Sequence, residues 1–147
     1  MQLTLYTDYS LRVLIYLAVH RDSMVTTAEI ARAYAISASH LAKVVKQLAQ
    51  QGYIESARGR GGGMRLALPA DEIVIGDVVR SSEERLALVE CFDSEANECC
   101  IEPACGLARA MDEALRAFMD VLDGYTLADA VRRRSRLRSL LQIASSG

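Results

Sequence analysis

Residues 26–50 read TTAEIARAYAISASHLAKVVKQLAQ and contain two short helical patterns separated by a turn. Thr26 and Glu29 have the T-x-x-E spacing of a capping box, which predicts a helix through Tyr34. A second helix is predicted over residues 38–50, because its apolar residues recur at helical spacing. Two short helices joined by a turn of three or four residues are typical of the helix-turn-helix motif.

The residues after this motif predict a β-hairpin with a basic, glycine-rich tip. Tyr53-Ile54 begins an extended segment, which Arg58-Gly59-Arg60-Gly61-Gly62-Gly63 interrupts. Residues 64–68 then alternate in the manner of a strand until Pro69. A hairpin attached directly to a helix-turn-helix is a wing, so the pattern indicates a winged DNA-binding domain.

Helices are also predicted on both sides of this domain. Residues 8–20 have apolar residues at helical spacing, with Thr7 or Asp8 as the cap, and residues 73–80 predict a short strand followed by one or two helical turns. A long helix is predicted to extend to about Asp123, with Pro103 in its first turn. Its apolar stripe consists of Leu107, Met111, Leu115, Phe118 and Leu122.

This long helix exceeds what so small a domain needs for its own core, so we expect a second copy of the chain to cover it. The predicted fold class is mainly α: a winged helix-turn-helix with a small β-hairpin wing and a long C-terminal dimerisation helix. The expected divisions are a DNA-binding domain over 1–80, a cysteine-containing loop over 81–105, a dimerisation helix over 106–123 and a C-terminal segment and mobile tail over 124–147.

Length and hydropathy limit the class of protein further. The chain has 147 residues, 51% of them hydrophobic, which is enough for one domain with its own core. The longest uninterrupted apolar run, residues 13–19, is far shorter than the ~18 residues of a membrane span. No secretory signal pattern precedes or follows it, so we expect a cytoplasmic protein without a membrane partner.

Charge is unevenly distributed, although the net charge is only −2. Residues 32–65 contain six basic residues and one acidic residue, whereas residues 83–102 contain seven acidic residues and one basic residue. All four cysteines lie inside or just beyond the acidic stretch. The basic segment is therefore expected to bind a polyanion, and the cysteine-containing segment is expected to bind a group that takes thiolate ligands.

The basic residues coincide with the elements that meet DNA in this architecture. A recognition helix needs short polar or basic side chains near its N-terminus, where they reach base edges and phosphates. The candidates on this helix are Ser37, Ala38, Ser39, His40, Lys43 and, one turn further, Lys46. Arg58, Arg60 and Arg65 of the wing are expected to reach phosphates or a minor groove. Double-stranded DNA is the predicted partner, and no catalytic residues are predicted.

The cysteines are Cys91, Cys99, Cys100 and Cys105, and their spacing leaves several chemistries open. A structural disulfide is disfavoured in a reducing compartment. Zinc often uses paired C-x2-C units, which are missing here. An iron-sulfur cluster tolerates irregular loop spacing, so Cys91, Cys99 and Cys105 could hold three corners. The spacing alone favours a cluster over zinc, with redox-active or inert cysteines as further alternatives.

Motifs along nearly the whole chain resemble the bacterial iron-sulfur winged-helix repressors of the NsrR/IscR family. They are Thr7-Asp8-Tyr9 with Leu11-Arg12, residues 58–66 of the wing, Ile75-Gly76-Asp77-Val78-Val79, the cysteine loop and Tyr125-Thr126-Leu127-Ala128-Asp129. Within that family, residues 99–105 resemble the nitric-oxide-sensing NsrR type. The resemblance implies a homodimeric repressor whose cluster controls DNA binding, with Cys91, Cys99 and Cys105 as ligands.

Cys100 departs from the family pattern, because it directly follows the second ligand position. It is expected to be a spectator, although it could replace Cys99 as a ligand or act as a resolving thiol. We expect a 4Fe-4S rather than a 2Fe-2S cluster. Asp8 of the partner subunit is the candidate fourth ligand, with an ordinary helix-capping role as the alternative. Glu90, Glu98 and Glu102 are rival carboxylates.

The sequence thus predicts a repressor whose cluster-containing form binds a pseudo-palindromic operator and whose nitrosylation releases it. The half-sites should lie about one helical turn, ~34–36 Å, apart. One alternative is a regulator of cluster supply or an iron-responsive regulator of the same family. From other classes, a structural-zinc DNA-binding protein and an iron-sulfur electron carrier stay open.

Overall fold

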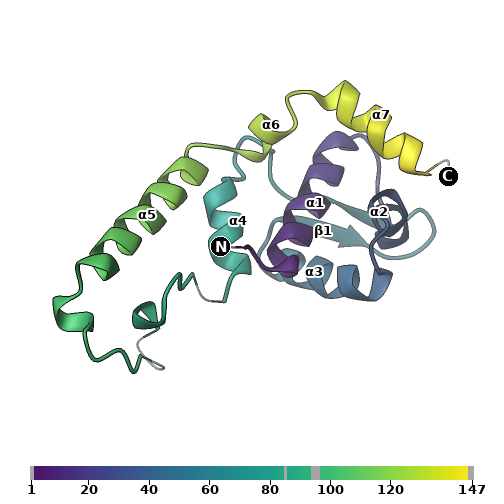
Figure 1. Ribbon diagram of the computed structural model, residues 1–147. Helices are drawn as coiled ribbons and strands as arrows, with labels where there is room; N and C mark the ends of the chain where they lie inside the picture. Colours follow the sequence, from purple (N-terminus) through teal and green to yellow (C-terminus); the bar gives the residue numbers. More distant parts are fainter. Residues whose placement is uncertain (1, 85, 94–96, 146–147) are drawn as a thin grey trace.

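The computed structural model describes residues 2–84, 86–93 and 97–145, and helices surround one small β-hairpin in it (Figure 1). Arg85 and Glu95 of the acidic stretch and the last two residues of the predicted tail lie outside the described residues. The helices are α1 (Leu5–Val19), α2 (Thr27–Tyr34), α3 (Ala38–Gln50), α4 (Ile75–Ser82), α5 (Gly106–Asp123), α6 (Leu127–Ala130) and α7 (Arg134–Ser145); the strands are β1 (Ile54–Ala57) and β2 (Gly63–Leu66).

Helices α2 and α3 form the predicted helix-turn-helix. The capping box at the start of α2 is present, since the Thr26 hydroxyl accepts a hydrogen bond from the Glu29 backbone N–H and the Glu29 carboxylate accepts one from the Thr26 backbone N–H at 2.6 Å. Ala35 ends α2 in a left-handed conformation. Ser37 stands at the N-cap position of α3, but its hydroxyl bonds the Ser39 hydroxyl at 2.8 Å and caps no backbone N–H.

Helix α1 starts earlier than the sequence pattern predicted. Thr4 is its N-cap, and the Thr4 hydroxyl accepts a hydrogen bond from the Thr7 backbone N–H at 3.3 Å. The predicted capping role of Thr7 or Asp8 is therefore wrong. Both residues already lie within the helix, so Asp8 instead provides a carboxylate in the first turn, where the helix dipole favours negative charge.

The wing is an antiparallel hairpin in which Ile54 pairs with Leu66 and Ala57 pairs with Gly63. Its second strand also forms a bridge between Met64 and Val25, so the wing is tied to the segment that joins α1 to α2. A side chain at Gly63 would come within 2.8 Å of the Val25 carbonyl oxygen. Glycine is therefore needed here for the close approach of two backbones.

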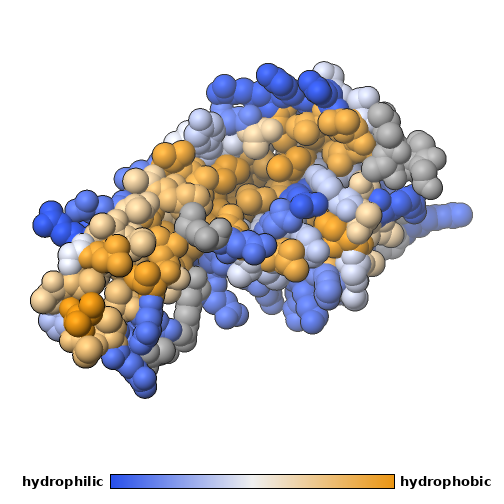
Figure 2. All heavy atoms as spheres, in the orientation of Figure 1, coloured by the Kyte–Doolittle hydropathy of each residue, from blue (hydrophilic) through white to orange (hydrophobic). Residues whose placement is uncertain are grey.

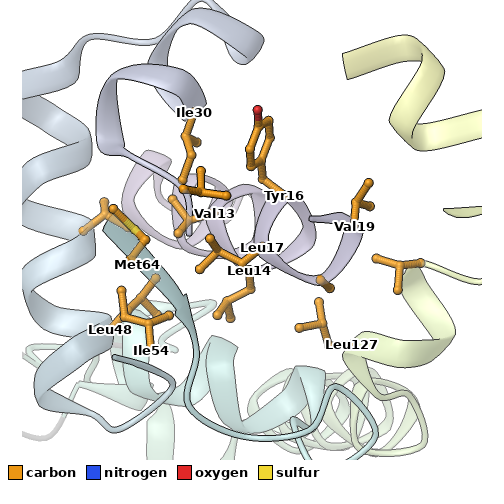
Figure 3. Packing of buried hydrophobic residues seen from close by; sticks show 14 of the residues in the cluster. Val13, Leu14, Tyr16, Leu17, Val19, Ile30, Leu48, Ile54, Met64 and Leu127 are labelled. Atoms are coloured by element: carbon orange, nitrogen blue, oxygen red, sulfur yellow. The ribbon is translucent and has the colours of Figure 1, made fainter. Parts of the chain in front are cut away.

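The core gathers around α1, whose Leu14 and Leu17 are almost completely buried. Figure 3 shows side chains of α1 packed with Leu48 of α3, Met64 of the hairpin and Leu127 of α6. Helices α1 and α3, the hairpin and α6 therefore contribute their apolar faces to a single core. This accounts for the helical spacing of the apolar residues in α1 and α3.

Helices α4 and α5 pack together beside the winged core. The predicted strand before α4 is reduced to one bridge, between Val74 and Thr126, which returns the chain after α5 to the domain. An ion pair between Arg80 and Asp123 joins α4 to the end of α5. Pro103 lies in a short 3-10 turn, and α5 begins only at Gly106, so the predicted place of Pro103 in the first turn of α5 is wrong.

The segment predicted as a mobile tail is α7, a helix packed against α2. Leu141 is buried, and Leu137 packs against the core cluster. Arg134 donates hydrogen bonds to the Val19 carbonyl oxygen and to the Asp22 carboxylate, both at 3.0 Å. Apolar residues spaced among the arginines explain the difference, because they give the segment a face that the core can bury. No helix of the described chain is long and apolar enough to cross a membrane.

Candidate functional site

Helix α3 divides into a buried face and a solvent face at its N-terminal end. Leu41, Val44 and Leu48 are buried. The predicted contact residues Ala38, Ser39, His40, Lys43 and Lys46 are all exposed, as is Ser37 before them. A surface of small, polar and basic side chains is thus held rigidly by a packed face, which is the arrangement a major-groove helix requires.

The wing divides its arginines between two roles. Arg58 and Arg60 are exposed at the hairpin tip. Arg65 lies within β2 directly opposite Glu55 of β1 and forms an ion pair with it. The tip arginines are therefore available to phosphates, whereas Arg65 is partly engaged in stabilising the hairpin itself.

The start of α1 contacts the recognition helix. Leu5, Tyr6 and Tyr9 face His40 and Lys43 across an apolar hollow of about 250 Å³. Leu5 is 63% exposed, although it is a large hydrophobic residue. A displacement of the first turns of α1 would therefore change the surroundings of His40 and Lys43, which are two of the candidate DNA-contact residues.

Asp8 lies in a chain of contacts that also ends near the helix-turn-helix. Arg12 holds the Asp8 carboxylate with two contacts, at 3.1 and 2.8 Å, and its guanidinium stands 5.7 Å from the centre of the Tyr34 ring. Burial raises the pKa of Tyr34 to about 12, and the nearby Arg12 charge opposes that shift. Tyr34 is the last residue of α2, so Asp8 is linked through Arg12 to the turn before α3.

The cysteine loop has little regular structure apart from two 3-10 turns, Glu90–Phe92 and Glu102–Ala104. Cys91 lies in the first turn, and Cys105 forms the N-cap position of α5. A helix N-terminus favours a negative charge, which suits a thiolate at this position. All four cysteines are free thiols; Cys91, Cys99 and Cys105 are half-buried, whereas Cys100 is exposed.

The electrostatics of the loop indicate that its thiols are neighbours. Burial raises the pKa of the Cys91 thiol, and a hydrogen bond from the Cys91 backbone N–H to the sulfur opposes this. Cys99, Cys105 and Glu102 are near enough to raise it further. Among the described residues, no three Cys, His, Asp or Glu side chains gather closely enough to hold a single metal ion. Thiolates are the usual protein ligands of iron-sulfur clusters, so the three half-buried cysteines of the loop fit such a cluster by their chemistry.

The carboxylates that are candidates for the fourth ligand have different surroundings in the structure. Asp8 lies in α1, which Figure 1 shows apart from the cysteine loop, and the described contacts of its carboxylate are with Arg12. Glu90 accepts a hydrogen bond from the Glu98 backbone N–H at 2.8 Å and is thereby engaged within the loop. Glu102 lies beside Cys91.

Glu83 is a residue whose role the sequence pattern does not indicate. One oxygen of its carboxylate accepts hydrogen bonds from the Thr4 backbone N–H at 2.8 Å, the Thr4 hydroxyl at 3.0 Å and the Thr7 hydroxyl at 2.5 Å. Glu83 directly follows α4, where the chain leaves for the cysteine loop. The contact therefore joins the start of that loop to the start of α1 across 79 residues of sequence, a separation at which local patterns give no signal.

Residues 3–133 match the family described as Rrf2, iron-dependent transcriptional regulator. The chain belongs to the Rrf2 family. The Rrf2 match extends from the start of α1 to beyond α6 and thus includes the winged domain, the cysteine loop and α5. The role implied by this membership is transcription regulation.

Two relatives refine the assignment within Rrf2. The HTH-type transcriptional regulator NsrR of Geobacillus kaustophilus (strain HTA426) is 54% identical, with 97% of each chain covered. The HTH-type transcriptional regulator NsrR of Bacillus subtilis (strain 168) is 49% identical, over 97% of this chain and 99% of the relative. The predicted resemblance to the NsrR type is confirmed.

Solved Rrf2-like structures agree with the fold. CymR, the global cysteine regulator of B. subtilis, superposes with a TM-score of 0.74 at 28% identity, covering 90% of this chain and 98% of that one. IscR of T. potens gives a TM-score of 0.73 at 23% identity, covering 90% and 88%, which shows likeness of fold alone. The predicted winged helix-turn-helix class is confirmed.

Proposed function

We propose that the chain is a homodimeric repressor that binds a pseudo-palindromic operator and senses nitric oxide through an iron-sulfur cluster, 4Fe-4S in preference to 2Fe-2S. The cluster-containing form binds DNA, and nitric oxide releases it. Residues 1–80 bind DNA, 81–105 hold the cluster and 106–123 form the dimer. Residues 124–147, expected to include a tail, pack in part on the winged domain through α6 and α7.

The observation that carries this proposal is the difference between the four thiols. Cys91, Cys99 and Cys105 are half-buried and electrostatically coupled, and we assign them as the cluster ligands. Cys100 is exposed, which supports its role as a spectator.

When bound, an iron-sulfur cluster supplies iron centres that react with nitric oxide. The partner subunit would contribute Asp8 as the fourth ligand, because α1, which contains Asp8, lies apart from the cysteine loop of its own chain in Figure 1. If the Asp8 carboxylate bound iron, its negative charge would be divided between the metal and Arg12. A released Asp8 would form a stronger ion pair with Arg12. Arg12 lies over the ring of Tyr34, the last residue of α2. Binding or release of Asp8 would therefore change the contacts next to the turn before α3.

Helix α5 has a surface suited to a second copy of the chain. The stripe predicted to face the partner, from Leu107 through Leu122, is in large part half-buried, and Leu115 and Phe118 line a small hollow with Leu86 and Leu88 of the same chain. A different apolar row is exposed instead, at spacings of 3, 4, 3 and 4. Its members are Leu107, Ala110, Ala114, Ala117 and Val121.

This exposed row supports dimerisation through α5. Alternating spacings of three and four residues let helices pack side by side, and alanines allow their backbones to approach closely. A neighbouring side of α5 is charged, with ion pairs between Arg109 and Glu113 and between Arg116 and Asp112. Figure 2 shows largely hydrophobic colouring over the α5 end of the molecule. A second copy of α5 is therefore the occupant we propose.

In the proposed complex, each recognition helix enters the major groove of one half-site. Ser37, Ala38, Ser39, His40, Lys43 and Lys46 form its contact surface, and Arg58, Arg60 and Arg65 of the wing reach the adjacent backbone. Each phosphate contact releases counterions, so binding should weaken steeply with salt. Because Arg65 is paired with Glu55, we expect Arg58 and Arg60 to contribute more than Arg65.

The test is a titration of the anaerobically purified protein with nitric oxide while visible absorbance and operator binding are followed together. We expect a brown protein with stoichiometric iron whose affinity for DNA falls at least tenfold as the chromophore is consumed. Changes of Cys91, Cys99 or Cys105 to Ser should each abolish the chromophore. Cys100→Ser is the matched control and should preserve both the chromophore and the response.

The other outcomes distinguish the alternatives. A colourless protein with stoichiometric zinc would indicate a structural-zinc DNA-binding protein, and a brown protein that does not bind DNA would indicate an electron carrier. A brown protein that binds DNA and responds to iron supply but not to nitric oxide would indicate a regulator of iron or cluster supply. Loss of the chromophore in Cys100→Ser would contradict the assignment of the ligands.

A further inference from the structure

Five arginines occur within seven residues at the start of α7, and the winged-helix architecture gives them no role. They are Arg132, Arg133, Arg134, Arg136 and Arg138. Two have structural partners in the chain: Arg132 pairs with Asp129, and Arg134 pairs with Asp22 and caps the carbonyl end of α1. These two contacts anchor the start of α7 to the domain.

The positive charges of the other three arginines are not balanced by acidic residues of the described chain. Arg133, Arg136 and Arg138 are exposed, and none forms an ion pair within the described part of the chain. Figure 2 shows a hydrophilic band along the edge of the molecule where Figure 1 places α6 and α7.

The position of α7 determines which partner this surface can meet. α7 packs on α2, with Leu137 and Leu141 turned toward the core. In a helix-turn-helix the first helix of the pair, here α2, crosses the DNA backbone while the second enters the groove. α7 therefore adjoins the helix that crosses the DNA backbone, and Arg134 anchors its start to the end of α1, outside the surface of α3 itself. α2 also contributes Arg32, an exposed basic residue in its last turn.

We propose that Arg133, Arg136 and Arg138 form a second phosphate-binding surface, which contacts the DNA backbone flanking each half-site. The proposal rests on operator binding through α3, as described above, and adds a contact outside the bases that α3 and the wing reach. Guanidinium groups bind phosphates in a bidentate manner without reading sequence. The surface would therefore increase affinity and lengthen the protected DNA without changing which bases are preferred.

The test compares two duplexes that carry the same core, a site selected by the wild-type protein from randomised DNA. One duplex ends at the outer edges of the half-sites, and the other extends about one helical turn, ~10 base pairs, beyond each edge. We expect the wild-type protein to bind the longer duplex at least fivefold more tightly. Its plot of log affinity against log salt should also be steeper on the longer duplex, by about one unit for each added phosphate contact.

The variant Arg133→Gln/Arg136→Gln should lose most of the advantage of the longer duplex and keep its affinity for the shorter one. The addition of Arg138→Gln should remove the rest. The matched control is Arg109→Gln/Arg116→Gln on α5, which removes the same charge from exposed arginines elsewhere. Circular dichroism and thermal melting establish that each variant folds, as expected for substitutions of exposed side chains.

Equal affinity of the wild-type protein for both duplexes would overturn the inference and leave operator binding intact. An equal loss in the α5 control would also overturn it, because the effect would then reflect net charge rather than position. If the wild-type protein selects no duplex at all, operator binding itself fails. The two failures are therefore distinguishable.

Discussion

At the scale of single residues, Glu83 shows how one carboxylate can join distant parts of the chain. A single oxygen accepts three hydrogen bonds from Thr4 and Thr7, and Thr7 is fully buried. The negative charge also lies at the N-terminus of α1, where the helix dipole favours it. Because Glu83 precedes the cysteine loop and Asp8 directly follows Thr7 in the first turn of α1, this contact joins the two segments to which we assign cluster ligands.

Glu83→Ala should destabilise the protein by about 1–3 kcal/mol, since it leaves the buried Thr7 hydroxyl and the Thr4 N–H without their acceptor. Glu83→Gln retains a carbonyl oxygen and should lose less. Chemical denaturation of the purified protein measures both changes. The neighbouring exposed Glu84, changed to Ala, is the control and should stay within about 0.5 kcal/mol of the wild type. Equal effects of the changes at Glu83 and Glu84 would contradict the assigned contact.

At the scale of elements, the wing depends on a close approach that its sequence alone does not display. The run of glycines at its tip reads as flexible, yet Gly63 faces the Val25 backbone so closely that a β-carbon has no room. The bridge between Val25 and Met64 thereby attaches the wing to the helix-turn-helix. The orientation of the tip arginines relative to α3 follows from this attachment.

Gly63→Ala should move β2 away from the Val25 segment, with a loss of about 1–3 kcal/mol of stability from overpacking. DNA affinity should fall as well, because the wing loses its fixed orientation. Thermal melting and binding titrations test the two effects. Gly106→Ala provides the comparison, since a β-carbon there has open space among the described residues and alanine favours a helix. A Gly63 variant with wild-type stability would show that the hairpin adjusts without cost.

At the scale of the whole molecule, α5 extends away from the winged domain and exposes an apolar row (Figure 1). An apolar row that is exposed to water on a helix is typical of a surface that binds a partner. The cysteine loop lies at the start of the same helix, apart from α1 of its own chain. Both features point to the dimer as the working unit, as proposed above.

Ala114→Glu should therefore convert the dimer into monomers, because it introduces a charge at the centre of the exposed row. We expect the dissociation constant to rise at least tenfold, about 1.4 kcal/mol, in sedimentation equilibrium. Arg116→Gln changes the net charge by the same amount on the charged side of α5 and should leave the dimer unchanged. If the Ala114 variant dimerises as the wild type does, the partner binds elsewhere.

Local patterns in the sequence were sufficient for most elements. The capping box at Thr26 and Glu29, the spacing of Leu41, Val44 and Leu48, and the glycine-rich tip all act over a few residues, and each predicted its element correctly. Errors arose where a signal was weak or competed with another. Thr4 rather than Thr7 caps α1, and the arginine-rich segment forms a helix because Leu137 and Leu141 find a core to pack against.

The sequence by itself therefore determined the winged fold, the basic recognition surface and the cysteine set, since these depend on residue type and short spacing. Only the tertiary structure decided which contacts join them: Glu83 to the start of α1, Arg12 to Tyr34, α7 to α2 and the exposed row of α5. Such contacts link residues far apart in the chain or select one face of a helix. They depend on how the whole core closes, which no local pattern encodes.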